Sequence, residues 1–214
     1  MNNIIRRPFR YRNNNVVYWL IGINVIIFTA MQLFGRDFSH QVVVRMAMIP
    51  LAVREGWVWT FVTYMFLHGN LRHILFNMLG LFIFGIHVER QMGSWEFLLY
   101  YFVTGTLAGI FSFIMYYFTG SYMVALMGAS GALFAVMLAY AVFFPDSIIY
   151  IWGILPLRAP VLVLGYTVLE LFFSVSGRTS GVAHLTHLAG FGFGWLYFMI
   201  RFGMSPWRRL TGRR

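Results

Sequence analysis

The chain has 214 residues, of which 60% are hydrophobic and only 10% are charged. Soluble domains carry about 25% charged residues, so this composition excludes an ordinary soluble fold and predicts that lipid surrounds much of the chain. Cysteine and lysine are both absent, which excludes disulfides, a thiolate nucleophile, a lysine Schiff base and a Ser-Lys dyad. The net charge of +10 comes from arginines at the chain ends and between apolar runs, a pattern that favours anionic lipid headgroups over nucleic acid as the partner.

Six apolar runs predict an all-α, polytopic membrane bundle, because a bilayer-spanning helix needs about 20 largely apolar residues. The bundle occupies residues 16–202, between a basic tail at 1–15 and a second basic tail at 203–214. No small-residue cleavage site follows the first run, so we expect a retained helix rather than a cleaved signal peptide. The six expected transmembrane helices are Val16–Phe34, Leu71–Val88, Phe97–Phe118, Ser130–Phe144, Ala159–Val175 and Thr186–Phe202.

The arginines predict the orientation. With a cytoplasmic N-terminus, eleven of the 16 basic residues fall on the cytoplasmic side and five on the outer side. The positive-inside rule therefore places both termini in the cytoplasm, in a plasma membrane of the bacterial inner-membrane type. The segment Gly35–Asn70 is too long for a turn and is rich in aromatic residues, so we expect a partly embedded outer loop.

Four polar side chains in the spans fall at one depth. At a rise of about 1.5 Å per residue, Asn77 lies about 18 Å and His73 about 24 Å above Glu89. Ser130 lies about 22 Å above the end of its helix at Pro145, and His187 about 21 Å above Arg201. Polar groups in spans usually face the bundle interior or a wet cavity. These residues therefore predict one hydrated layer below the outer surface.

The fourth run is also too short to cross the membrane alone. Fifteen residues cover about 22 Å, less than a hydrocarbon core of about 30 Å. We therefore expect the preceding stretch, Gly120–Gly128, to descend into the membrane to meet it. Irregular backbone at that depth is tolerated where it is buried in protein or lines a wet cavity.

The polar layer contains the groups needed for acyl transfer. Ser130 becomes nucleophilic only with a neighbouring base, and His187 is the best base at that depth. Glu170 is the only acid inside a span, and we place it nearer the cytoplasmic half of its helix, which leaves a Ser-His dyad without a third carboxylate. The backbone N–H of Ser130 at a helix start, with the side chains of His73 and Asn77 one turn apart, predicts an oxyanion site.

Each motif also has a simpler interpretation. Gly128-Ala129-Ser130-Gly131 alone is typical of helix packing, and it departs from the soluble-hydrolase pattern G-x-S-x-G at Ala132. A membrane histidine such as His187 often has a structural or conducting role, and His73 with Asn77 could form interhelical hydrogen bonds. Gly190-xxx-Gly194 predicts close helix packing in either case. The shared depth of these motifs favours a functional interpretation over four separate structural ones.

As a set, the motifs resemble the rhomboid family of intramembrane serine proteases over roughly residues 16–202. The order and spacing of three motifs, on the second, fourth and sixth helices, are specific for that family. The matching residues are Trp59, Thr63, His68, His73-Ile74-Leu75-Phe76-Asn77, Glu89-Arg90, Gly93-Ser94, Gly128-Ala129-Ser130-Gly131 and His187-Leu188-Ala189-Gly190 with Gly194.

The resemblance implies a six-helix bundle that cleaves transmembrane protein substrates near their outer ends, with lateral access near the fifth helix. Ser130 is then the nucleophile, His187 the general base, and His73, Asn77 and the Ser130 amide the oxyanion site. Glu89 ties the second helix to its neighbours. Two positions depart from patterns found in some members: Thr60 stands where they carry Arg, and Phe134 stands where they carry Tyr.

No cofactor or metal is expected, since neither HExxH nor clustered carboxylates occur, and no chemistry is assigned to His40, His87 or His184, the last expected in a loop.

Two rival functions stay open. A channel or transporter predicts polar residues along a path through the whole membrane, whereas this chain concentrates them in one layer. A non-catalytic chaperone that binds membrane helices on the same scaffold predicts that function survives loss of Ser130.

Overall fold

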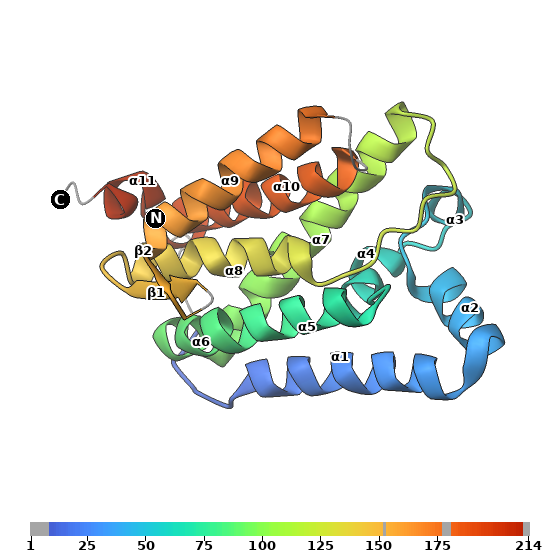
Figure 1. Cartoon of the computed structure of the whole chain (residues 1–214), viewed down its shortest axis with the longest axis horizontal. Coiled ribbons are helices and arrows are strands. Elements are labelled where there is room, and N and C mark those ends of the chain that lie inside the picture. The colour runs from blue at the N-terminus through green and yellow to red at the C-terminus, as the bar shows by residue number, and fades with distance from the viewer. Residues whose placement is uncertain (1–8, 152, 177–180, 212–214) are drawn as a thin grey trace.

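The structure is a computed structural model that describes residues 9–151, 153–176 and 181–211. Parts of both basic tails lie outside these residues. So do five arginines of the charge count, namely Arg6, Arg7, Arg178, Arg213 and Arg214. Over the described ranges the chain forms a bundle of helices with one small hairpin (Figure 1).

A helix lies at each of the six expected positions. Three of these helices, α1, the continuous 71–92 segment and α7, are long and apolar enough to cross a membrane by length and composition. The mainly helical fold is therefore confirmed, and the arrangement is consistent with six spans. The bounds are α1 Val16–Leu33; α5 Leu71–Gly80, running through the π-helical η3 Leu81–Gly85 into α6 Ile86–Met92; α7 Ser94–Phe118; α8 Ser130–Phe143; α9 Ala159–Ser176; and α10 Gly181–Tyr197, extended by η4 Phe198–Phe202.

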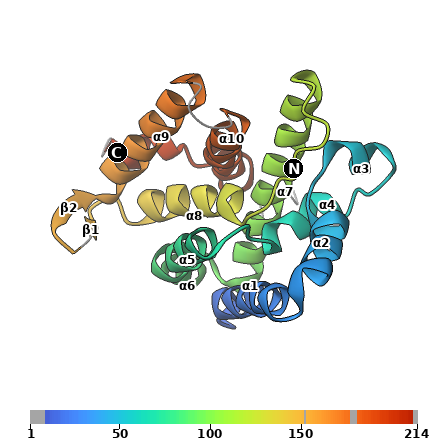
Figure 2. The ribbon, with the colours of Figure 1, turned by 45° about the vertical axis from the view of Figure 1, so that its right-hand side comes forward.

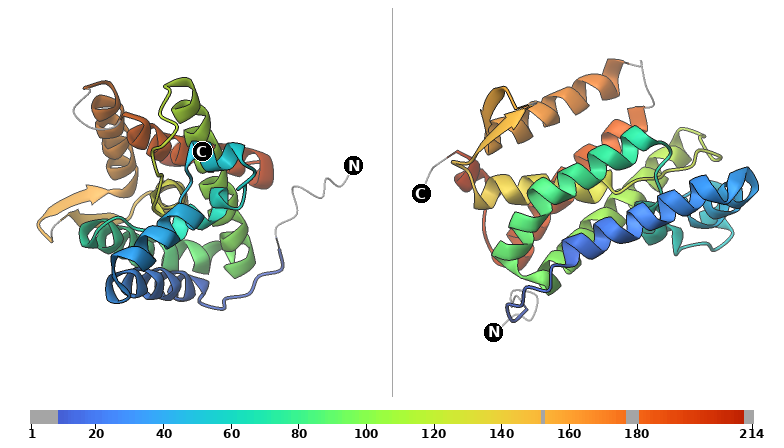
Figure 3. Two further views of the ribbon diagram at one scale, coloured as in Figure 1. Left: turned by 90° about the vertical axis from the view of Figure 1, so that its right-hand side faces the viewer. Right: turned by 60° about the horizontal axis from the view of Figure 1, so that its bottom comes forward.

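The short helix α8 forms the centre of the bundle, and α5, α7, α9 and α10 pack around it (Figure 2). Eleven of its 14 residues are buried. Many of these are Ala or Gly, and small side chains let helix backbones approach closely when lipid supplies no hydrophobic driving force. Helix α1 lies on the far side of α5 from α9, as the two views of Figure 3 show. The serine at the start of α8 is therefore placed inside the bundle.

The outer loop is folded rather than irregular. It contains α2 Gly35–Met46, α3 Pro50–Arg54, α4 Thr60–Thr63 and the 3-10 turn η2 Tyr64–Phe66. Tyr64 is buried, and its hydroxyl donates to the carbonyl of Gly105 on α7 at 2.7 Å. The loop therefore contributes to the core of the bundle at the end from which α8 starts.

The chain leading into α8 runs along the outer loop, and its backbone is paired with that loop. Met48 and Leu126 exchange two backbone hydrogen bonds, of 3.2 and 2.9 Å, and the Gly128 N–H donates to the Tyr64 carbonyl at 3.0 Å. These bonds replace water as partners for irregular backbone inside the protein.

The opposite end of the bundle departs from the all-α expectation. Strands β1 Ile148–Ile151 and β2 Leu155–Arg158 pair antiparallel between α8 and α9. Strands of four residues leave too short a pattern to detect in the sequence. The segment before α1 and the short helix α11 Pro206–Leu210 lie at the same end (Figure 1).

Two buried carboxylates hold this end together. Glu89 accepts the backbone N–H groups of Val16 and Val17 at 2.8 and 3.0 Å, and so caps the start of α1. Glu96 on α7 accepts two hydrogen bonds from Arg201, of 2.8 and 2.9 Å, and one from the Tyr197 hydroxyl. The sequence analysis assigned Glu89 this kind of role but gave Glu96 none.

Candidate active site

Ser130 and His187 meet inside the bundle. Ser130 is the first residue of α8 and His187 lies in α10. The Ser130 Oγ and the His187 Nε2 are 2.9 Å apart, which is hydrogen-bonding distance. The two helices pack closely at Gly190. A Cβ at this position would lie 2.1 Å from the Gly131 carbonyl oxygen, so only glycine fits there.

The imidazole of His187 is also held from one face. The ring of Phe134, one turn after Ser130, stacks on it with ring centroids 4.4 Å apart and planes 9° apart. A phenyl ring supplies this contact without offering a hydrogen bond. The departure from Tyr at this position therefore retains the stacking on the imidazole.

His73 approaches the loop that delivers Ser130. Its Nε2 would lie 2.5 Å from a Cβ built on Gly128, whose φ of +123° also favours glycine. The ring contacts His68 edge to face, with centroids 5.0 Å apart. His68 lies before the second span, where burial and then the neighbouring His73 lower its pKa to about 3. His68 is therefore neutral at physiological pH.

A cleft of about 810 Å³ joins the four predicted side chains, since His73, Asn77, Ser130 and His187 all line it. Asn77 lines this cleft, and its Nδ2 donates one hydrogen bond to the His73 carbonyl at 2.8 Å. Its Oδ1 has no hydrogen-bond partner among the described residues. Because a carboxamide nitrogen carries two N–H groups, the bond to the His73 carbonyl leaves the second N–H of Asn77 as a donor for an oxyanion.

The expectation that no carboxylate orients His187 is wrong. The Glu170 Oε1 lies 3.0 Å from the His187 Nδ1, and the Oε2 lies 2.6 Å from the His184 Nδ1. Glu170 is eleven residues from Ala159 and five from Val175, so it lies about 8 Å from the Val175 end of its helix rather than in the half that begins at Ala159. His184 is also not a loop residue, because α10 begins at Gly181 rather than at Thr186.

These three residues are also the one group of potential metal ligands found among the described residues. One donor atom from each of Glu170, His184 and His187 lies within 4.8 Å of the others. The sequence motifs predicted no metal site and did not reveal this cluster. A signal was present in the sequence, since His184 and His187 are spaced i, i+3 and an acid occurs in the neighbouring span.

The remaining predicted residues have structural contacts. The Trp59 Nε1 donates to the Arg45 carbonyl at 2.9 Å and so connects α4 to α2. Gly131 and Gly194 lie at close helix contacts, Gly131 against Ala108 and Gly194 against Ala135. Thr60, the other departure, is buried, and its hydroxyl donates to the Trp57 carbonyl.

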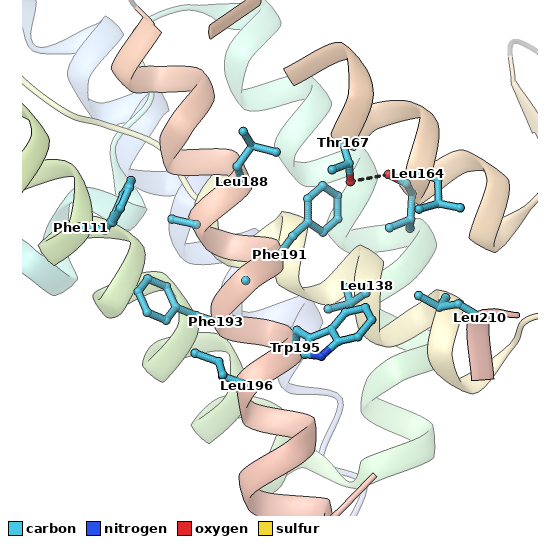
Figure 4. A pocket seen from close by; sticks show the side chains of 13 residues that line it. Phe111, Leu138, Leu164, Thr167, Leu188, Phe191, Phe193, Trp195, Leu196 and Leu210 are labelled. Carbon is cyan, nitrogen blue, oxygen red and sulfur yellow. Dashed lines mark hydrogen bonds between the residues drawn. The ribbon is translucent and has the colours of Figure 1, made fainter. Parts of the chain in front are cut away.

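A second cavity, of about 620 Å³, lies along α10 and offers no chemistry. Side chains of α7, α8, α9 and α10 line it, and nearly all are apolar (Figure 4). The hydroxyl of Thr167 donates to the Val163 carbonyl within α9. The cleft at Ser130 is thus the cavity that combines a nucleophile, a base and donors.

Comparison with known proteins identifies the family of the chain. Residues 55–204 match the rhomboid domain. The chain belongs to the rhomboid family. The family membership expected from the motifs is therefore confirmed, and the apolar helices and the family together identify an integral membrane protein.

Named rhomboids from plants and bacteria are similar to the chain. RHOMBOID-like protein 12, mitochondrial, of Arabidopsis thaliana is 29% identical over 194 residues, which is 81% of this chain and 55% of that protein. Rhomboid protease GlpG of Haemophilus influenzae is 28% identical over 131 residues, 61% of this chain and 64% of that protein. Rhomboid protease AarA of Providencia stuartii is 28% identical over 160 residues, 65% of this chain and 54% of that protein. The chain thus spans about half to two thirds of the length of these rhomboids.

Proposed function

We propose that this rhomboid is an intramembrane serine endopeptidase in which Ser130 is the nucleophile and His187 the general base. The observation that carries the proposal is the 2.9 Å contact between the Ser130 Oγ and the His187 Nε2 at the wall of a cleft. Rhomboid relatives whose names describe proteases support the same reaction class.

The reaction follows the chemistry of these groups. The Ser130 hydroxyl attacks the peptide carbonyl while its proton passes to the His187 Nε2. The imidazolium then protonates the leaving amine as the C–N bond breaks, which leaves an acyl ester on Ser130. Water, deprotonated by the same imidazole, hydrolyses the ester and releases the acid product.

Donors for the oxyanion surround the same point. The Ser130 N–H is in the first turn of α8, where backbone N–H groups lack intrahelical acceptors and the helix dipole is positive. His73 lies against Gly128 beside it. Asn77 adds a further donor, because its Nδ2 carries a second N–H beyond the one that binds the His73 carbonyl.

The cleft also fits the proposed class of substrate, which is a transmembrane protein segment. From Ser130 it extends between α5 and α9 over α8, past Phe76, Ile83, Met137 and Leu162, as far as the hairpin. An apolar cleft between helices offers a transmembrane helix a route from lipid to the serine. We extend the proposal to a bacterial-type inner membrane with cytoplasmic termini, on the arginine distribution alone.

A serine-directed fluorophosphonate tests the proposal directly. We expect covalent labelling of the wild type in detergent, an adduct on Ser130 by mass mapping, and cleavage of a transmembrane reporter in proteoliposomes. Ser130→Ala abolishes both signals. The matched control Ser174→Ala retains both, because the Ser174 hydroxyl donates within its own helix, to the Leu171 carbonyl.

The same experiment separates the rival functions. A chaperone that binds membrane helices keeps its binding activity in Ser130→Ala and gives no labelling in the wild type. A channel or transporter gives ion or solute flux in sealed liposomes that does not depend on Ser130. Cleavage by Ser130→Ala at the wild-type rate would refute the proposed nucleophile.

A further inference from the structure

Glu170 connects the fifth and sixth predicted spans at the level of the serine. One carboxylate oxygen lies 3.0 Å from the His187 Nδ1, and the other lies 2.6 Å from the His184 Nδ1. The side chains of Glu170, His187 and His184 are 12%, 23% and 19% exposed. The contacts are therefore largely shielded from water. Hydrogen bonds to a charged group are stronger in such a shielded site than in water.

The carboxylate determines which nitrogen of His187 carries the proton. An ionised carboxylate can only accept, so the Nδ1 of each histidine must be the donor. A neutral imidazole with its proton on Nδ1 has a bare Nε2. That bare nitrogen is the atom facing the Ser130 hydroxyl, so the ring is in the tautomer that can take the serine proton.

We propose that Glu170 is a positioning residue that completes a Ser130–His187–Glu170 array and uses His184 to hold its second oxygen. This inference rests on the proposed protease function and extends it. When the serine proton moves to Nε2, Glu170 stays ionised and faces the imidazolium, so the positive charge forms beside a fixed negative one. No proton moves to Glu170, and the same proton later leaves with the amine.

His184 accounts for the orientation of the carboxylate. Because His184 and His187 are one turn apart on α10, they present their Nδ1 atoms to the two oxygens of a single side chain on α9. Phe134 restrains the plane of the His187 ring from α8, and Glu170 restrains its rotation within that plane. The other titratable side chains that line the same cleft are Arg72 and His73 on α5, Tyr150 on β1 and Tyr166 on α9.

The test replaces the carboxylate without changing its size. We expect Glu170→Gln to lower kcat by up to about 10⁴-fold, the loss found when the acid of a serine-protease triad is replaced. KM and the melting temperature stay near the wild-type values. The acidic limb of the pH–rate profile moves to lower pH, since the imidazolium loses its counter-charge. Glu170→Asp recovers part of kcat, and His184→Gln lowers it by less than Glu170→Gln.

The outcomes separate this inference from the proposed function. Wild-type kcat and pH profile in Glu170→Gln, with Ser130→Ala inactive, would overturn the role of Glu170 alone, whereas an active Ser130→Ala overturns the protease itself. A matched loss of melting temperature and kcat that Glu170→Asp does not repair would indicate a purely structural contact. The exposed Glu55→Gln is the charge-matched control.

Two further measurements decide the matter even where Glu170→Gln does not fold. In the wild type, ¹⁵N NMR of histidine-labelled protein should show His187 protonated at Nδ1, and a proton on Nε2 at the pH of maximal activity would contradict the proposal. All assays are run with and without EDTA. Activity that requires zinc would also contradict it, because a cation rather than a hydrogen bond would then occupy the Nδ1.

Discussion

At the end of the bundle that carries the hairpin, Glu89 and Glu96 accept hydrogen bonds from backbone N–H groups and from an arginine, whereas at the opposite end Glu170 accepts them from two histidines. The first two carboxylates bind backbone N–H groups, an arginine and hydroxyl groups, all of which keep their protons at physiological pH. The third binds rings that gain and lose protons. The same residue type thus fixes helices at one end and prepares a base for proton transfer at the other.

The largest effect on stability is expected at Glu96. Glu96→Ala leaves the Arg201 guanidinium without its carboxylate and should cost about 3–5 kcal/mol of unfolding free energy, as for other broken buried ion pairs. Thermal or SDS unfolding of the purified protein measures it. The double variant Glu96→Ala/Arg201→Met should recover part of the loss, and a double variant less stable than the single one would contradict this account.

At the serine end, Asn77→Ala should affect rate rather than stability. Loss of one oxyanion donor costs about 10²–10³-fold in kcat, and in the resting structure Asn77 donates only to its own helix. Reporter cleavage, with the melting temperature measured in parallel, checks both parts. An unchanged kcat would show that the Asn77 amide does not donate to the oxyanion.

Glu89→Gln should lower stability by less than Glu96→Ala and leave the rate unchanged, which tests the difference between the two ends of the bundle. The amide keeps one acceptor oxygen but loses the charge that faces the N-terminus of α1, so we expect a loss of about 2 kcal/mol in stability. The kcat of the remaining folded protein should equal that of the wild type. A fall in kcat at full stability would mean that this end of the bundle also tunes the reaction.

The smallest effect is expected at Phe134. Phe134→Leu removes the ring that stacks on His187, and aromatic pairs contribute about 0.5–1.5 kcal/mol, so kcat should fall less than about tenfold. Phe134→Tyr is the matched control, since it keeps the ring and should keep the rate. Equal losses in both variants would indicate that shape, rather than stacking, matters here.

The sequence predicted the meeting of Ser130 and His187 because helical rise fixes depth along a span. It could not fix rotation about the helix axis. Placing Glu170 in the wrong half of its helix also concealed its contacts with His184 and His187. The pair Glu96 and Arg201 is separated by 105 residues, and periodicity does not reveal which distant side chains meet.

The first turn of α8 lies inside the protein instead of in bulk solvent, because the preceding loop carries it inward to Ser130. Mobile ions screen the partial positive charge of an exposed helix terminus but screen a buried one much less. Turnover should therefore vary little with ionic strength as long as the substrate itself enters through lipid.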